Sequence, residues 1–428
     1  MPSVAAHLRI LRESLTTHVP YTAGVHPVKA EDLAIYYATD EESNARVINL
    51  GNATEACLAE LAAACEPASF GVNQKDVLDE SYRKAGKMDL TRFAARLDVV
   101  ASGIIDAISP DILDEEDAEG EKVLRAEMYK LNVYGPGSFF KAHKDTPRGE
   151  SMIGSLVVVL PTAHKGGELT LSHGATTWTF DSAAELGTAA GPSVAYVAFY
   201  SDVTHAVKPV QEGHRVTLTY NLFLADRTGA AGRRLTPPPE NAFERALSAL
   251  LTDESFFPYG GLLAYGLEHQ YPIPTSAKRT SLGPVLQMLK GSDARIRTIS
   301  ARAGLATHVK ILYNNGGRYD NELLVDHVLN LENVDEQYGR SVHEELQSEG
   351  VILQHAEERD SEDGGMYYGV EEYNQESVPV HWVMQITTLN CVGSGYLAYG
   401  NESSIGHVYG NAALFVSVPA VGAGVRGA

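Results

Sequence analysis

Two side chains that can bind a metal ion stand two residues apart in the segment "FFKAHKDTPRG", residues 139–149. They are His143 and Asp145, and imidazole nitrogen and carboxylate oxygen are both common ligands of transition metals. If the segment is the end of a β-strand, the alternation of side chains along a strand places both on one face. A chain of this length should contain about one H-x-D tripeptide by chance, so the context has to decide.

A third ligand has to come from another strand. The segment "AFYSDVTHAVKPVQEGHRVTLTYNL" supplies His205 just after an apolar run. Two histidines and one carboxylate on one side of a metal leave the other positions open, as in non-haem Fe(II) oxygenases. On the next strand, Arg215 can hold a carboxylate through two parallel hydrogen bonds, and Thr217 is a further donor two residues on.

These segments resemble the Fe(II)/2-oxoglutarate-dependent dioxygenases, and within them the prolyl-4-hydroxylase-like branch. The resemblance is carried by "YGPGSFFKAHKDTP", "LPTAHKGGELTLSHG" and "VAFYSDVTHAVKPVQEGHRVTLTYNL". It is closest to fungal members whose substrates are largely unassigned, and it extends more weakly over nearly the whole chain. It implies that His143, Asp145 and His205 are the catalytic ligands of Fe(II), and that Arg215 anchors the co-substrate 2-oxoglutarate.

Members of this branch often carry a tyrosine on the strand after H-x-D, where it shares the 2-oxoglutarate carboxylate. The corresponding segment here, "SLVVVLP", has none. Thr217 and Tyr134 are therefore the residues that we expect to complete the 2-oxoglutarate site. A purely structural role stays open for both residues, because threonine and tyrosine are common in strands for packing alone.

The resemblance also implies the reaction. Fe(II), 2-oxoglutarate and O₂ together oxidise a C–H bond of an organic substrate, with release of succinate and CO₂, and ascorbate is a further expected reductant. Hydroxylation is the default outcome, and cyclisation or desaturation would use the same ligands. We expect a small substrate such as an amino acid. A protein hydroxylase of the prolyl type and a non-catalytic jelly-roll that binds a metal or a ligand remain alternatives.

Composition narrows the partners. The 428 residues include 34 basic and 55 acidic ones, for a net charge of −21, which disfavours nucleic acid and anionic membrane surfaces. The three cysteines, Cys57, Cys65 and Cys391, form neither a disulfide framework nor a C-x-x-C pair. The N-terminus lacks a signal-peptide core and no run approaches 18 apolar residues, so we expect a cytoplasmic protein. The oligomeric state stays open.

Four regions follow from the periodicity. Residues 1–121 contain amphipathic runs such as "TEACLAELAAAC" and are predicted to be mainly helical. Residues 122–225 are a series of short β-rich runs typical of a sandwich or partly open barrel, and 226–240 are a Gly/Pro-rich linker. Residues 241–428 mix helices and strands. The predicted fold is mainly β with helices (α+β): a double-stranded β-helix, or jelly-roll, core braced by N-terminal helices, with an α+β C-terminal region.

Other histidines receive a structural interpretation. His164, His173 and His214 fall in turn-like segments and are predicted to be solvated. The pairs His343/Glu345 and His355/Glu357 imitate an H-x-E motif, but no second histidine stands at a suitable spacing.

Overall fold

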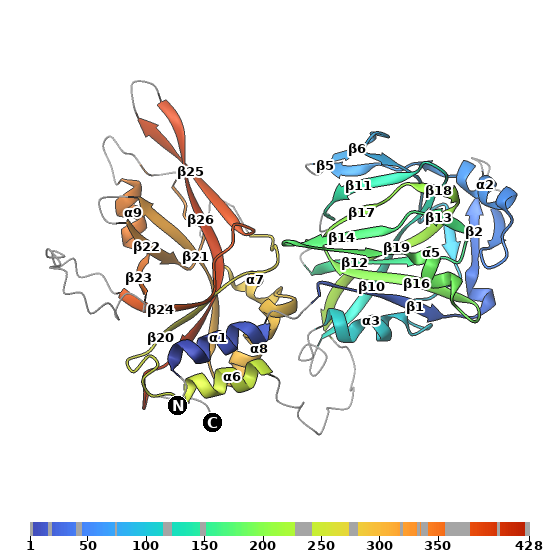
Figure 1. Cartoon of the computed structure of the whole chain (residues 1–428). Coiled ribbons are helices and arrows are strands. Elements are labelled where there is room, and N and C mark those ends of the chain that lie inside the picture. Colours follow the sequence, from blue (N-terminus) through green and yellow to red (C-terminus); the bar gives the residue numbers. More distant parts are fainter. Residues whose placement is uncertain are drawn as a thin grey trace. The chain divides into compact units, whose positions relative to one another are not determined.

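A computed structural model describes residues 3–15, 19–39, 45–72, 75–113, 122–145, 151–226, 242–273, 281–316, 320–331, 334, 341–355, 377–399 and 403–423. The chain forms two compact units. Unit 2 comprises Val19–Arg234, and unit 1 combines Met1–His18 with Leu235–Ala428 (Figure 1). None of the helices in the described ranges is long and apolar enough to cross a membrane.

Unit 2 is built from two main antiparallel sheets. The larger has seven strands in the order β1 (Tyr21–Pro27), β16 (Ser193–Tyr200), β12 (Met152–Val159), β19 (Arg215–Asp226), β10 (Lys122–Tyr134), β8 (Gly86–Asp89) and β4 (Glu66–Pro67). The smaller has five, in the order β15 (Thr176–Phe180), β14 (Leu169–His173), β17 (Thr204–Val207), β11 (Phe139–His143) and β7 (Arg83–Lys84). Together they form the predicted double-stranded β-helix core, to which the earlier strands β1, β4, β7 and β8 are added.

The central strands of the large sheet are buried on both faces, which explains their apolar runs. Leu156 and Val158 on β12 are completely buried, as are Val194 and Val197 on β16. Strands covered on both sides have near-continuous apolar sequences instead of a strict alternation. Helix α3 (Ile104–Ile112) covers part of the sheet through contacts with β1, β10 and β16. Its isoleucines, spaced by about one turn, are buried in the same core.

The N-terminal region was predicted to be mainly helical, and this was wrong. Within residues 1–113, the structure has the helices α1 (Val4–Leu15), η1 (Ala30–Leu33), α2 (Glu55–Ala63) and α3, together with nine strands, β1 to β9. The smaller elements of this unit are β2 (Ala34–Ala38), β3 (Ala45–Asn49), β5 (Phe70–Val72), β6 (Lys75–Val77), β9 (Phe93–Ala95), β13 (His164–Gly166), α5 (Ser182–Gly187) and β18 (Val210–Gly213). Most of these early strands are two to five residues long. Such strands form because distant segments offer an edge to pair with, and they carry little periodicity of their own.

One predicted helix of this region is present and another starts late. The run 54–65 forms α2, whose N-cap Thr54 accepts a hydrogen bond from the backbone of Cys57. The run 90–108 instead contains β9, and α3 begins only after Gly103, whose positive φ of 89° sets the turn into the helix. The predicted linker lies outside the described residues after Asp226.

Unit 1 contains a closed barrel. Six strands pair in a ring: β20 (Gly261–Gly266), β24 (Ser377–Met384), β23 (Val351–His355), β22 (Asp320–Val325), β21 (Ala306–Gly316) and β26 (Ser403–Val418), which returns to β20. A seventh strand, β25 (Cys391–Tyr399), extends the sheet from β26. Every strand of the ring contributes to one apolar cluster, which comprises Ala264, Leu312, Leu324, Leu353, Val380, Ala413 and Phe415. Because the ring is closed, each of its six strands pairs with a neighbouring strand on both sides.

Helices cover the barrel on the outside, as the α+β prediction for this region requires. They are α1, α6 (Ala242–Leu251), α7 (Gly283–Gln287), α8 (Gly291–Arg302) and α9 (Val342–Glu349). Although α1 starts the chain, it packs against α6 and β24, so it belongs to this unit. Leu8, Leu11 and Leu15 share one helix face and lie in the core of unit 1.

Candidate metal centre

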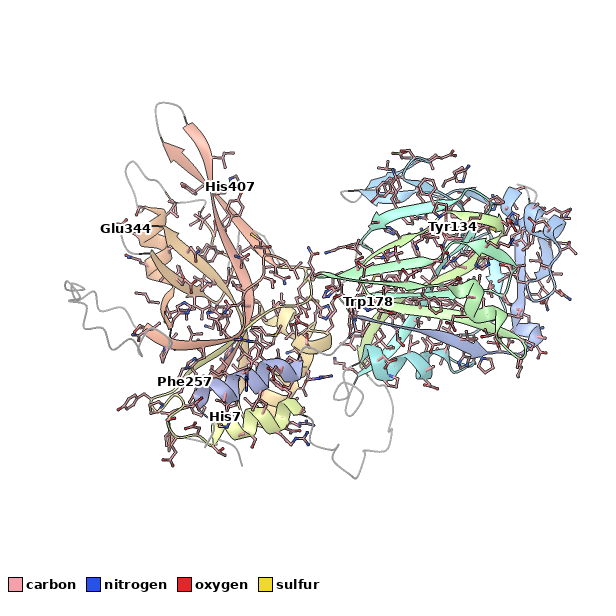
Figure 2. The ribbon with its side chains drawn as sticks, viewed as in Figure 1. His7, Tyr134, Trp178, Phe257, Glu344 and His407 are labelled. Carbon is pink, nitrogen blue, oxygen red and sulfur yellow. The ribbon has the colours of Figure 1, made fainter. Side chains whose placement is uncertain are left out.

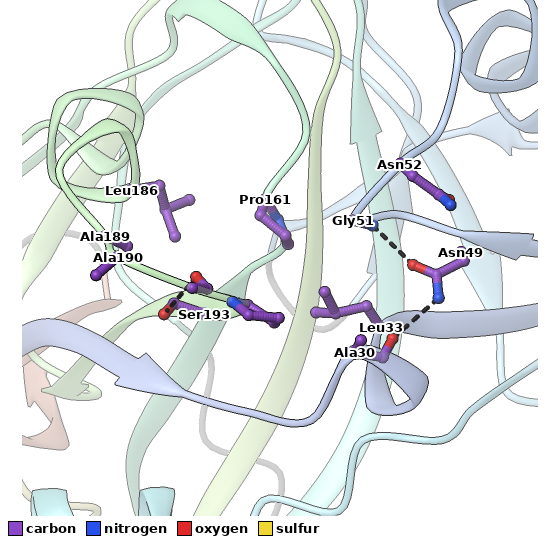
Figure 3. Close-up of a pocket in the computed structure, with 12 residues that line it drawn as sticks. Ala30, Leu33, Asn49, Gly51, Asn52, Pro161, Leu186, Ala189, Ala190 and Ser193 are labelled. Atoms are coloured by element: carbon purple, nitrogen blue, oxygen red, sulfur yellow. Dashed lines mark hydrogen bonds between the residues drawn. The ribbon is translucent and has the colours of Figure 1, made fainter.

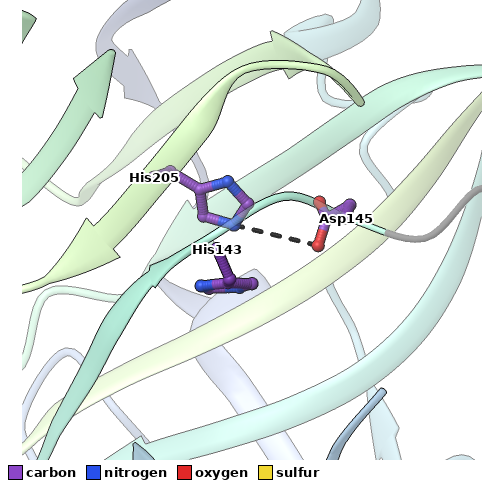
Figure 4. A group of neighbouring side chains, drawn as sticks. All are labelled: His143, Asp145 and His205. Carbon is purple, nitrogen blue, oxygen red and sulfur yellow. Dashed lines mark ion pairs between the residues drawn. The ribbon is translucent and has the colours of Figure 1, made fainter. Parts of the chain in front are cut away.

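Three side chains that can bind a metal converge at one end of the five-stranded sheet. His143 ends β11 and His205 lies on the adjacent strand β17, where the two residues are register partners. Asp145 follows β11 after two residues. One ligand atom from each of the three lies within 4.8 Å of the others (Figure 4). The predicted triad is therefore brought together by the folding of two neighbouring strands.

Both imidazole rings are oriented by their own backbone. Nδ1 of His143 lies 2.9 Å from the carbonyl oxygen of Lys141, and Nδ1 of His205 lies 3.1 Å from that of Val203. A ring that donates from Nδ1 to a carbonyl keeps the lone pair on Nε2, which is the usual arrangement in metal-binding histidines. Nε2 of His205 lies 3.8 Å from Oδ1 of Asp145. The free ring nitrogen of His205 thus faces the carboxylate.

The protonation states suit a metal site. Burial, together with the neighbouring His205, lowers the pKa of His143 to about 3. Burial would raise the pKa of Asp145, but the charge of His205 and the hydroxyl of Ser155 outweigh it, so this pKa is lowered. At neutral pH, His143 is neutral and Asp145 is ionised. Metal ligands must be in these forms.

Arg215, at the start of β19, is the most informative polar residue in the rest of unit 2. Its side chain is only 1% exposed, and burial lowers its pKa. Nε and Nη2 have no hydrogen-bond partner, and within the described ranges no carboxylate forms an ion pair with it. A buried guanidinium without an anion is costly. The site is therefore suited to a ligand that brings its own carboxylate.

Tyr134 and Thr217 lie next to Arg215 on the same face of the large sheet. Tyr134 is the register partner of Arg215 on β10, and its ring centroid is 5.7 Å from the guanidinium carbon. Thr217 is two residues along the same strand and is also buried. Figure 2 labels Tyr134 among the strands of this unit. The structure thus groups all three residues that were predicted to hold the co-substrate.

The "GGEL" turn supports the stem of Arg215. Gly167 has a positive φ of 75°, and a Cβ at this position would lie only 2.9 Å from Cδ of Arg215. Only glycine combines this backbone conformation with so close an approach. The turn therefore fixes one side of the guanidinium.

Three structural features escaped the sequence analysis. Ser155, on β12, donates a 2.5 Å hydrogen bond to Oδ2 of Asp145, but its only signal was one hydroxyl in an apolar run. Arg83, on β7, is buried close to His143, although its strand has only two residues. His164 and His214 were predicted to be solvated, but the structure places a ring nitrogen of each out of contact with solvent. Nε2 of His164 and Nδ1 of His214 are buried, because β13 and the start of β19 are packed inside the unit.

A separate cavity of about 430 Å³ lies away from the metal centre (Figure 3). It is lined by Ala30, Leu33, Asn49, Gly51, Asn52, Pro161, Leu186, Ala189, Ala190, Gly191, Pro192 and Ser193. None of these residues is charged, and Asn49 uses its side chain to hold the backbone of Ala30 and Gly51. The cavity thus offers little for chemistry.

Residues 129–223 match the model of the 2OG-Fe(II) oxygenase superfamily. The match covers the triad and Arg215, so the chain contains a 2OG-Fe(II) oxygenase domain. This family uses Fe(II), 2-oxoglutarate and O₂, and the His/Asp/His cluster and the unpaired guanidinium are the kinds of group that such cofactors need.

Among solved structures, a prolyl-4-hydroxylase from Pseudomonas putida is similar at 19% identity, over 52% of this chain and 100% of its own, with a TM-score of 0.29. An oxidoreductase of the 2OG-Fe(II) oxygenase family from Burkholderia pseudomallei is similar at 17% identity, over 53% and 95%, with a TM-score of 0.23. A prolyl hydroxylase from Trichoplax adhaerens, in complex with a hypoxia inducible factor peptide, follows at 12% identity, over 50% and 88%, with a TM-score of 0.28. No curated protein matches the chain.

Proposed function

We propose that this protein is an Fe(II)- and 2-oxoglutarate-dependent dioxygenase that oxidises a C–H bond of a small organic substrate. In this proposal His143, Asp145 and His205 hold the metal. Arg215 holds the distal carboxylate of 2-oxoglutarate, with Thr217 and Tyr134 beside it. When bound, Fe(II) with 2-oxoglutarate and O₂ supplies the oxidising power, and succinate and CO₂ are released.

The observation that carries this proposal is the buried, unpaired guanidinium of Arg215 in the same domain as the triad. A barrel that only bound a metal would gain nothing from it, whereas a 2-oxo acid with a second carboxylate satisfies it. The non-catalytic alternative is disfavoured for this reason.

The protein's own residues prepare the site. Ser155 and the backbone carbonyls at Lys141 and Val203 orient the three ligands. The Phe140 ring stacks on His143 at 3.5 Å between centroids, and Phe199 packs against His205 at 4.5 Å. These contacts each cover part of an imidazole ring and help to hold the two histidines in place.

The direct test is to measure metal and 2-oxoglutarate binding by anaerobic calorimetry, and succinate formation in air. His143→Ala and His205→Ala should each lose metal binding and turnover, because two remaining ligands are too few. His407→Ala, which removes an exposed histidine of unit 1, is the matched control. Full metal affinity in either triad variant would refute the ligand assignment. A wild-type protein that binds metal but not 2-oxoglutarate would favour the non-catalytic alternative.

A further inference from the structure

A second buried guanidinium lies beside the metal centre. Arg83 on β7 is the register partner of Phe140 on β11, and only 6% of its surface is exposed. Its guanidinium carbon lies 4.4 Å from the centroid of the Phe140 ring, and this ring stacks on His143. Phe140 therefore contacts both Arg83 and a proposed metal ligand. Arg83 also contributes to the lowered pKa of His143 through its charge.

Arg83 joins the two sheets without meeting an anion. Nη2 donates a 2.8 Å hydrogen bond to Oδ1 of Asn132 on β10, and Nη1 donates a 2.7 Å hydrogen bond to the carbonyl of Ser69. Both acceptors are neutral. Nε is buried and has no hydrogen-bond partner, and no carboxylate in the described part of the chain forms an ion pair with Arg83. A guanidinium has five N–H donors, so three of them remain for a ligand.

Asn132 places this guanidinium near the proposed co-substrate. It is the register partner of Thr217, two residues from Tyr134 on the same face of the large sheet. Its own Nδ2 donates a 3.0 Å hydrogen bond to Thr219, which fixes the amide so that the oxygen faces Arg83. The guanidinium is thus held in one orientation.

Arg83 has no anionic partner among the named groups of the proposed complex. The positive charges of Fe(II) and Arg215 are matched by the negative charges of three carboxylates. One belongs to Asp145 and two belong to 2-oxoglutarate. Arg83 adds one further positive charge in a water-poor site, where an unpaired charge is costly. A carboxylate of the substrate would give the Arg83 guanidinium the anionic partner that it lacks.

We propose that Arg83, oriented by Asn132, binds a carboxylate of the substrate, so that the substrates are small carboxylic acids such as free amino acids. The fork formed by Nε and Nη2 suits two parallel hydrogen bonds to one carboxylate. This inference rests on the proposed oxygenase function and narrows it. A prolyl residue inside a peptide chain has no such group.

The probes are the twenty free L-amino acids and their α-carboxamides. Their binding is measured by ligand-observed NMR and calorimetry on protein loaded with 2-oxoglutarate and an inert divalent metal. At least one acid should bind about 100-fold more tightly than its amide. In Arg83→Gln this preference should fall to within about threefold, while the affinity for 2-oxoglutarate stays unchanged. Lys84→Gln, an exposed neighbour on the same strand, should keep the wild-type preference.

Asn132→Asp tests the idea without removing the buried cation. The new carboxylate would lie within hydrogen-bond distance of Arg83 and replace the substrate carboxylate, so the protein should fold while the preference for acids is lost. Should Arg83→Gln fail to fold, this variant decides. An acid preference that survives Asn132→Asp and Arg83→Gln would overturn the proposal.

The panel also separates the two hypotheses. If 2-oxoglutarate does not bind, the oxygenase function itself fails. If 2-oxoglutarate binds but no free acid does, only the role of Arg83 is refuted. Binding of a prolyl peptide blocked at both ends, in preference to every free acid, would refute it equally.

Discussion

The hydroxyl of Ser155 donates a 2.5 Å hydrogen bond to Oδ2 of Asp145, while Oδ1 of the same carboxylate faces Nε2 of His205 at 3.8 Å. Ser155 is almost completely buried on β12, in the sheet opposite the histidines. The two sheets are therefore linked at the metal centre through one side-chain contact, which also leaves one carboxylate oxygen for the metal.

Removing this contact should weaken metal binding without abolishing it. We expect Ser155→Ala to lower the metal affinity by about 10- to 100-fold, because Asp145 would lose the group that orients it. The measurement is a calorimetric titration with Fe(II) under anaerobic conditions. Ser151→Ala, at an exposed position just before the same strand, is the control. Equal affinities in the two variants would show that Asp145 needs no such support.

Substitutions of Arg215 should affect the co-substrate and not the metal. Lysine keeps the charge but loses the fork, so Arg215→Lys should weaken 2-oxoglutarate binding, and Arg215→Ala should weaken it by about 2–5 kcal/mol. Metal affinity should change little. The dissociation constants of 2-oxoglutarate with an inert metal in place check this. An unchanged constant in Arg215→Ala would point to another basic residue as the anchor.

Thiol chemistry should distinguish the cysteines. Burial raises the pKa of Cys65 to about 12, whereas Cys57 and Cys391 are exposed. At pH 8 only about one Cys65 side chain in 10,000 would be a thiolate, and the thiolate is the reactive form. A disulfide reagent should therefore modify two thiols quickly and the third slowly. Its rate at Cys65 should rise as the pH approaches 12. Rapid loss of all three thiols at pH 8 would contradict the raised pKa of Cys65.

The first helix should stabilise the C-terminal part of the chain. Leu11 on α1 is fully buried in the core of unit 1, so Leu11→Ala should destabilise that unit by about 2–5 kcal/mol. Ile10→Ala, at a position 45% exposed on the same helix, should have little effect. Thermal unfolding measures both, and metal binding should persist in both. Similar melting temperatures would show that α1 contributes nothing to unit 1.

Much of the oxygenase core could be predicted from sequence because its strands have strong local signals. Runs of β-branched residues marked β12 and β16, and strand alternation placed His143 and Asp145 on one side. The interpretation of Arg215 rested on the same alternation. These features depend on the nearest few residues.

What escaped prediction depends on contacts between distant segments. The hydroxyl of Ser155 gains meaning only when the opposite sheet brings Asp145 to it. Arg83 lies on a strand too short to show a period. The spacing of Leu8, Leu11 and Leu15 on α1 indicates that one face of the helix is buried, but it does not indicate which element covers that face. Its partner, α6, comes only after the whole jelly-roll.

Helix α1 is synthesised before unit 2, but unit 1, to which it belongs, can be completed only after unit 2. A ribosome releases this helix before the oxygenase unit, which is inserted between the two parts of unit 1, and the partners of the helix emerge only after that unit. The inserted unit can fold as soon as it has emerged. The side chains of Leu8, Leu11 and Leu15 stay exposed to water until α6 and β24 are synthesised. The nascent chain therefore carries an exposed apolar helix while the oxygenase unit is translated, and it is at that stage that we expect chaperones to engage it.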